Sequence, residues 1–253
     1  MQIALAFGQW ADLLFLRDRL RNRFGVVSDE LRHDPISQLA KSSISGRTYD
    51  EVSAAAYERL VSHYPDVETL ADASAEEIEV VISNVTHARD KAIHLREALR
   101  KIRAREGRIS LDFLYDWPVD LAYRLLESLP GVGAKTAAAL LNFSTLGKRI
   151  FVVDGHVERV LKRFGFVGAK ADAEDVLDTV MASADAFDAD DLYELHWLLK
   201  YLGQEICRFD SPRCNECPLA DSCMKRVEAK TKANTSLQTQ IGHQAREHAT
   251  LTG

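Results

Sequence analysis

The chain has 253 residues, of which 46% are hydrophobic and 28% charged, so it is long enough to bury the core of one large domain or two small ones. It contains no run of 18 apolar residues, and its first residues lack the basic start of a signal peptide, which predicts a cytoplasmic protein without a membrane span. The net charge of −6 argues mildly against a nucleic-acid partner, but eight basic and only three acidic residues fall within residues 89–108.

Helical periodicity dominates along the chain. The pattern predicts helices over residues 11–23, 50–63, 75–83, 119–128, 135–143, 155–164, 173–182 and 190–202. A further helix carries the apolar stripe Ala92, Leu95, Leu99 and Ile102. The only strand-like run, 150–153, is too short to build a sheet. We therefore expect an all-α fold, followed by a polar and aperiodic tail over 228–253 that we interpret as disordered.

An arginine stripe adjoins the apolar stripe of the helix within residues 89–108. Its members are Arg89, Arg96, Arg100 and Arg103. Such a stripe can follow DNA phosphates, or it can be an ordinary solvated helix face.

A glycine-rich turn lies between two of the predicted helices, in the sequence LPGVGAKTAAALL. Gly131 and Gly133 allow the backbone to turn sharply and to approach a partner closely, and the amides at the start of the next helix favour an anion such as phosphate. With Val132 between them, these residues predict a helix-hairpin-helix over about 121–143 that grips the DNA backbone without reading its sequence. The alternative is a helical corner without a ligand.

An acidic residue, Asp154, stands immediately before the predicted helix 155–164. A carboxylate at this position is a good N-cap, which is the structural interpretation. The same side chain could also serve in a reaction if its second oxygen faces a cleft.

All four cysteines lie within 17 residues near the C-terminus, spaced C-x6-C-x2-C-x5-C. They are Cys207, Cys214, Cys217 and Cys223. This uneven spacing favours a [4Fe–4S] cluster, whose corners need thiolates from different directions. Zinc ligation is the main alternative and usually shows two C-x2-C pairs, and disulfides are a third possibility.

Taken together, the hairpin, Lys135 at its end, the stretch VDGHVERV and the four-cysteine spacing resemble the endonuclease III family. These are DNA glycosylases of the helix-hairpin-helix superfamily that carry an iron–sulfur cluster. The likeness covers about residues 30–223. It implies a two-lobed fold, with a helical bundle over 30–148 and an iron–sulfur domain formed by 1–29 and 149–227.

The resemblance also implies a mechanism. Lys135 would attack the sugar C1′ of an extruded nucleotide, Asp154 would assist, and the Schiff base would allow strand cleavage by β-elimination. Only an unprotonated amine attacks, so the pKa of the lysine must fall from about 10.4. His156 matches a family histidine and is expected to position the DNA backbone or the aspartate.

Two positions depart from the family pattern. Arg47 stands where the family has a glutamine that fills the gap left by the flipped base, and His87 stands where a leucine is usual. We expect both residues to contact DNA, and the departures leave the preferred lesion open.

The predicted function is therefore base excision repair of damaged, oxidised pyrimidines by a DNA glycosylase with AP lyase activity. The expected partner is double-stranded DNA with a damaged base or an abasic site, and we expect a monomer associated with the nucleoid and not with a membrane. Two alternatives stay open. One is a monofunctional uracil or mismatch (thymine or adenine) glycosylase, and the other is a non-catalytic DNA-binding iron–sulfur protein.

Overall fold

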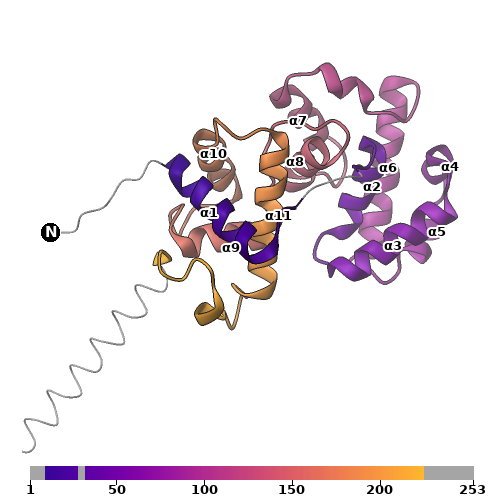
Figure 1. Cartoon of the computed structure of the whole chain (residues 1–253). Coiled ribbons are helices and arrows are strands. Elements are labelled where there is room, and N and C mark those ends of the chain that lie inside the picture. Colours follow the sequence, from indigo (N-terminus) through magenta and orange to yellow (C-terminus); the bar gives the residue numbers. More distant parts are fainter. Residues whose placement is uncertain (1–8, 28–31, 225–253) are drawn as a thin grey trace, which may run out of the picture. The chain divides into compact units, whose positions relative to one another are not determined.

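The computed structural model describes residues 9–27 and 32–224, and within these ranges it contains helices but no β-strand (Figure 1). The all-α prediction is confirmed. The predicted tail over 228–253 lies outside the described residues. Within the described part of the chain, no helix is long and apolar enough to cross a membrane.

The chain divides into two compact units. Among the described residues, unit 1 comprises 9–27, 154–185 and 197–224, and unit 2 comprises 32–153 and 186–196. These bounds differ from the predicted ones, because unit 2 continues past residue 148 to Val153 and takes in 186–196. Two hydrogen bonds account for this: Arg149 Nε donates to the carbonyl of Phe187 at 2.8 Å, and a ring nitrogen of His196 lies 2.8 Å from the carbonyl of Val152.

Unit 2 contains the helical bundle. Its elements are α2 (Pro35–Ser45), α3 (Asp50–His63), α4 (Val67–Asp72), α5 (Ala75–Val81), α6 (Ala88–Glu106), the 3-10 helix η1 (Asp112–Asp116), α7 (Val119–Glu127) and α8 (Ala134–Phe143). Helix α6 contacts α2, α4 and α5, while α8 contacts α2 and α7. The core is formed by apolar side chains that the helical period places on one face, such as Leu39, Leu60, Ile78, Leu95 and Leu99.

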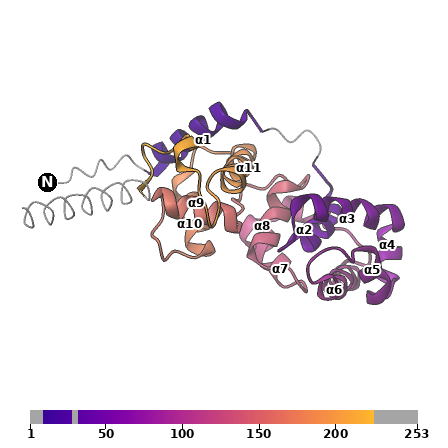
Figure 2. The ribbon, with the colours of Figure 1, turned by 90° about the horizontal axis from the view of Figure 1, so that it is seen from below.

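Unit 1 contains α1 (Gln9–Phe24), α9 (Gly155–Phe164), α10 (Ala173–Ser183) and the short η2 (Cys214–Glu216). Helix α11 (Ala189–Glu205) belongs to both units, since its residues up to 196 fall in unit 2 and those from 197 in unit 1. Figures 1 and 2 both show α1, α9 and α10 gathered beside α11. The buried stripe of α1, formed by Leu13, Leu16 and Leu20, belongs to the unit 1 core.

Two helices of unit 2 were not predicted from the periodicity. Helix α2 starts at an Asp–Pro pair, with the Asp34 carboxylate accepting from the amides of Ile36 and Ser37. Helix α4 has only six residues. The strand-like run 150–153 is buried and extended and joins no sheet.

Candidate functional site

The hairpin turn in unit 2 is built around Gly131. Its φ is +71°, a value that L side chains rarely adopt, and a Cβ placed there would lie 2.6 Å from Cβ of His94 on α6. The glycine therefore serves both the turn and the close approach of the turn to α6. The side chain of Val132 is buried and its amide donates to the carbonyl of Leu129 at 3.1 Å, so this residue belongs to the turn itself and offers no side-chain surface.

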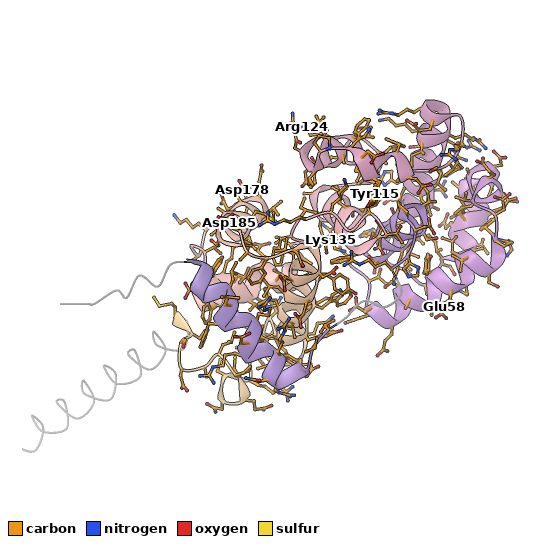
Figure 3. The ribbon with its side chains drawn as sticks, turned by 45° about the horizontal axis from the view of Figure 1, so that its top comes forward. Glu58, Tyr115, Arg124, Lys135, Asp178 and Asp185 are labelled. Carbon is orange, nitrogen blue, oxygen red and sulfur yellow. The ribbon has the colours of Figure 1, made fainter. Side chains whose placement is uncertain are left out.

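Helix α8 begins directly after the turn, with Gly133 as its N-cap and no side chain bonded to its first amides. The amides of a helix start and the positive end of its dipole form a site suited to an anion. Lys135 is the second residue of α8 and is half-buried (Figure 3). The structure therefore places the predicted lysine beside an uncapped helix start in unit 2.

A second lysine, Lys91, lies within electrostatic range of Lys135. Burial lowers the pKa of Lys91 below its usual value, and the positive charge of Lys135 acts in the same direction. Two cations thus share one region of unit 2. The sequence analysis did not single out Lys91, because it occupies one position in a helix rich in basic residues.

Arg47 and His87 are both exposed on loops of unit 2. Arg47 follows α2 and His87 is the N-cap residue of α6. Their φ angles are +55° and +57°, and among the described residues they are the only two with positive φ that are not glycine. Side chains are costly in this conformation, so both positions are backbone outliers of the kind that cluster at functional sites.

In unit 1, Asp154 is the N-cap of α9. Its Oδ1 accepts from the amide of His156 at 2.8 Å and from that of Val157 at 2.9 Å. The predicted cap is therefore present, and it engages one of the two carboxylate oxygens. Lys135 and Asp154 belong to different units.

The His156 side chain belongs to a network centred on Arg159. The guanidinium of Arg159 lies 3.0 Å from Nδ1 of His156 and donates to the carbonyls of Gly203 at 2.9 Å and Cys207 at 3.0 Å. Burial lowers the pKa of Arg159, while the charges of Cys207 and Asp154 act the other way. Arg159 therefore joins α9 to the end of α11 and to the start of the cysteine segment.

Arg163, one turn further along α9, continues this network. Its guanidinium donates to the carbonyls of Arg208 at 2.6 Å and Phe209 at 2.8 Å and lies 3.6 Å from Sγ of Cys207. The thiol of Cys223 in turn donates to the carbonyl of Arg163 at 3.2 Å. The helix that begins after the candidate aspartate is thus hydrogen-bonded to the cysteine segment from its middle, at Arg159, and from its C-terminal end, at Arg163.

None of the four cysteines is in a disulfide, and all are half-buried. Burial raises the pKa of Cys217 to about 11, and the charges of the other three thiols act in the same direction. The other three thiols thus lie within electrostatic range of Cys217, and a cationic centre would stabilise such thiols as thiolates. Within the described residues, however, no group of three or more His, Cys, Asp or Glu side chains is arranged to hold a metal ion.

The arginine stripe of α6 is held within unit 2. Arg103 donates to Glu68 at 3.1 Å and to Asp72 at 2.8 Å, and Arg100 donates to the carbonyl of Ala71 at 2.7 Å. Both residues therefore support the end of α4. These hydrogen bonds explain the positions of two of the four arginines without any contact to DNA phosphates.

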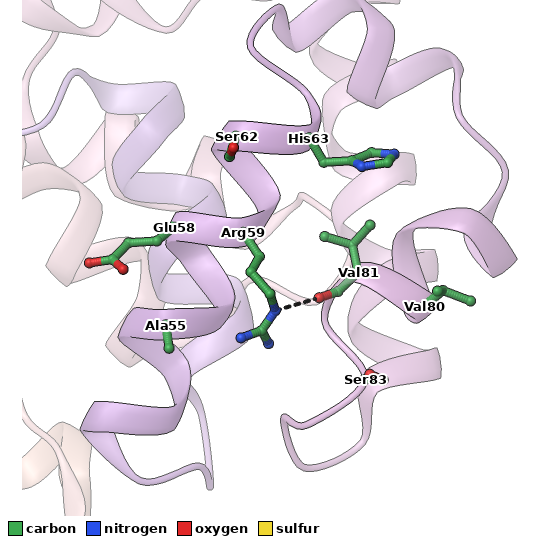
Figure 4. A pocket seen from close by; sticks show the side chains of 8 residues that line it. All are labelled: Ala55, Glu58, Arg59, Ser62, His63, Val80, Val81 and Ser83. Carbon is green, nitrogen blue, oxygen red and sulfur yellow. Dashed lines mark hydrogen bonds between the residues drawn. The ribbon is translucent and has the colours of Figure 1, made fainter.

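A groove of about 890 Å³ lies between α3 and the end of α5 in unit 2 (Figure 4). It is lined by Ala55, Glu58, Arg59, Ser62, His63, Val80, Val81 and Ser83. None of the residues predicted from the sequence lines this groove.

A family model described as "HhH-GPD superfamily base excision DNA repair protein" matches residues 41–184. The chain belongs to this superfamily. The matched range includes the hairpin, Lys135 and Asp154, whereas the four cysteines lie beyond it. The prediction of a base-excision DNA repair enzyme is therefore confirmed.

The chain is also similar to individual proteins of this superfamily. Endonuclease III of Bacillus subtilis is 29% identical over 83% of this chain and 90% of its own length. The transcriptional activator DEMETER of Arabidopsis thaliana is 30% identical over 68% of this chain, which spans only 9% of that protein. A solved structure of a trapped endonuclease III–DNA covalent intermediate has a TM-score of 0.74 and 25% identity, covering 87% of this chain and 98% of its own. The predicted likeness to the endonuclease III family is confirmed.

Proposed function

We propose that this superfamily member is a bifunctional DNA glycosylase and AP lyase that removes oxidised pyrimidines. Lys135 would be the nucleophile, Asp154 its carboxylate partner, and damaged double-stranded DNA the substrate. The observation that carries the proposal is the place of Lys135 in the first turn of α8, directly after the tight glycine turn. The likeness to endonuclease III, for which a covalent DNA intermediate has been trapped, supports the same chemistry.

The amine of Lys135 must be neutral to attack. The helix start at Gly133 and the positive charge of Lys91 both disfavour its protonated form. Nζ would then form a bond to the sugar C1′ while the bond from C1′ to the base breaks and the base leaves with the electron pair. Asp154 would stabilise the positive charge that develops on the sugar.

The covalent intermediate accounts for the lyase step. Opening of the sugar ring converts this N,O-acetal at C1′ into a protonated imine between Nζ and C1′, which makes the proton on C2′ acidic. Loss of that proton and departure of the 3′ phosphate oxygen break the strand by β-elimination. Water then hydrolyses the imine and releases Lys135.

The hairpin would hold the DNA backbone. Gly131 brings the turn close to α6, and the amides at the start of α8 point at the space where a phosphate would bind. Such contacts grip DNA without reading its sequence, as is required of an enzyme that searches for rare lesions.

The four cysteines would hold a [4Fe–4S] cluster, with all of its irons ligated by protein thiolates. Their shared electrostatics and the hydrogen bonds from Arg163 support this assignment over separate thiols. When bound, the cluster would cross-link the cysteine segment, and it would have no open position for substrate. A yellow-brown protein with about four irons per chain is expected, and a colourless zinc protein would refute the assignment.

Borohydride trapping tests the reaction. The protein is mixed with end-labelled duplexes that each carry thymine glycol, dihydrouracil, uracil or an abasic site, and borohydride reduces any imine to a stable adduct. We expect adducts with the two oxidised pyrimidines and with the abasic site. Lys135→Ala should abolish them, whereas Lys170→Ala, at an exposed lysine outside the hairpin, should leave them intact.

Three other outcomes of the trapping experiment would contradict part of the proposal. An adduct with the abasic site alone would retain the role of Lys135 and refute the assignment of oxidised pyrimidines. Base release from uracil without any adduct would indicate a monofunctional glycosylase. An adduct that persists in Lys135→Ala would assign the nucleophile to another amine.

A further inference from the structure

The two outlier residues of unit 2 stand on loops that are joined to each other. Arg47 and Thr48 lie in the loop after α2, and Thr86 and His87 lie in the loop before α6. The amide of Thr86 donates to Oγ1 of Thr48 at 3.0 Å. A single hydroxyl therefore connects the residue after Arg47 with the residue before His87.

Lys91 of α6 binds the same hydroxyl and the end of α2. Its ammonium donates to the carbonyls of Ile44 at 2.8 Å and Gly46 at 2.6 Å and to Oγ1 of Thr48 at 3.1 Å. An ammonium has three N–H donors, and all three are used here. Lys91 thus caps the C-terminal end of α2 with a cation, a favourable pairing with the helix dipole, and binds the bridging hydroxyl at the same time.

The second loop is also held from its other side. Arg59 of α3 donates to the carbonyl of Val81 at 3.2 Å and to Oδ1 of Asn84 at 2.8 Å, as Figure 4 shows for Val81. The segment that leads to His87 is therefore fixed by α3 at its start and by Thr48 and Lys91 near its end. The exposed side chains of Arg47 and His87 consequently stand on a rigid support.

We propose that Lys91 and Thr48 are positioning residues that lock the loops of Arg47 and His87 into one stiff probe for the base stack of duplex DNA. This inference rests on the proposed function and adds residues to it. Unstacking a base step costs a few kcal/mol, so an inserted side chain is useful only if its support does not yield. The left-handed backbone at both positions fits this role, because it is retained only where surrounding contacts fix it.

The test distinguishes the proposed insertion of Arg47 and His87 into the base stack from the reaction of Lys135 with the sugar. Thr48→Val removes the hydroxyl at nearly constant shape, and Thr48→Ser keeps the hydroxyl. Both variants are assayed for trapping rate on an abasic site in a full duplex and on the same site in a gapped duplex that lacks the three opposing nucleotides. The gapped duplex has no opposing base to displace, so it does not require the probe. Thermal unfolding confirms that each variant is folded.

We expect Thr48→Val to trap the full duplex at least tenfold more slowly than the unmodified protein. Its rate on the gapped duplex should stay within twofold, and Thr48→Ser should match the unmodified protein on both substrates. Equal loss on both substrates, or no loss on either, would overturn the proposed lock while leaving the lysine chemistry standing. If the unmodified protein traps neither substrate, the proposed function itself fails.

Discussion

Asp154 combines two properties in one side chain. Its Oδ1 caps α9 through the amides of His156 and Val157, and its carboxylate charge is what the proposed reaction needs. Asparagine caps a helix about as well as aspartate but carries no charge. The two properties can therefore be separated by one substitution.

We predict that Asp154→Asn keeps the stability of the protein and lowers base release by about 10²- to 10⁴-fold, the usual range for loss of a charged catalytic side chain. Asp154→Ala should lose activity to a similar extent and also lose about 1 kcal/mol of unfolding free energy, because the cap is removed. Single-turnover kinetics and urea unfolding measure the two effects. Near-normal activity in Asp154→Asn would remove this residue from the mechanism.

At the scale of elements, α9 and α11 approach each other closely at Gly203 within unit 1. A Cβ at Gly203 of α11 would lie 2.8 Å from Cβ and 3.3 Å from Cα of His156. The guanidinium of Arg159 donates to the carbonyl of the same glycine. The close approach therefore supports both the helix that follows Asp154 and the network that leads to the cysteines.

We predict that Gly203→Ala destabilises the protein by about 1–2 kcal/mol, although alanine is favoured over glycine inside a helix by about 1 kcal/mol. The clash with α9 outweighs this preference, since overpacking costs about 1–3 kcal/mol. The control is Gly168→Ala, where an added Cβ meets nothing within 4 Å and the expected change is at most about 0.5 kcal/mol. Thermal and urea unfolding measure both, and an increased stability of Gly203→Ala would contradict the packing argument.

At the scale of the whole molecule, the two units depend on different forces. Unit 2 has a continuous apolar core between its helices. In unit 1, the segment 207–224 has a single buried residue, Leu219, and is otherwise held by hydrogen bonds from α9. A segment with so little core needs a covalent or metal cross-link to stay ordered.

If the proposed iron–sulfur cluster is present, we predict that its removal by oxidation and chelation affects the two units unequally. Hydrogen exchange should accelerate in residues 207–224 and in α9, while α6 and α8 of unit 2 keep their protection. Metal-replete protein is the control, and mass spectrometry of peptides resolves the segments. Equal loss of protection in both units would show that the cysteine centre is not a local support.

The sequence predicted the strongly periodic parts of this molecule best. Helices α3 and α9 have the predicted bounds. A helical stripe of buried residues defines α3, whereas α9 has both an apolar stripe and the Asp154 cap. Helix α4 was missed because its six residues are supported by Arg100 and Arg103 of α6, a tertiary effect. The contacts of Thr48 with Thr86 and Lys91 could not be predicted for the same reason, since Thr48 lies 38 and 43 positions from them and meets them only in the folded unit.

The positive φ angles of Arg47 and His87 also limit how this protein can evolve or be redesigned. Valine, isoleucine and threonine tolerate this backbone poorly, whereas side chains without a branch at Cβ, such as asparagine, glutamine and leucine, are less restricted. A randomised library at these two positions should therefore return almost no β-branched survivors, whatever lesion is used for selection. New preferences for the opposing base would have to arise from the few side chains that lack a branch at Cβ. Glycine would remove the backbone strain but would leave no side chain to insert into the base stack.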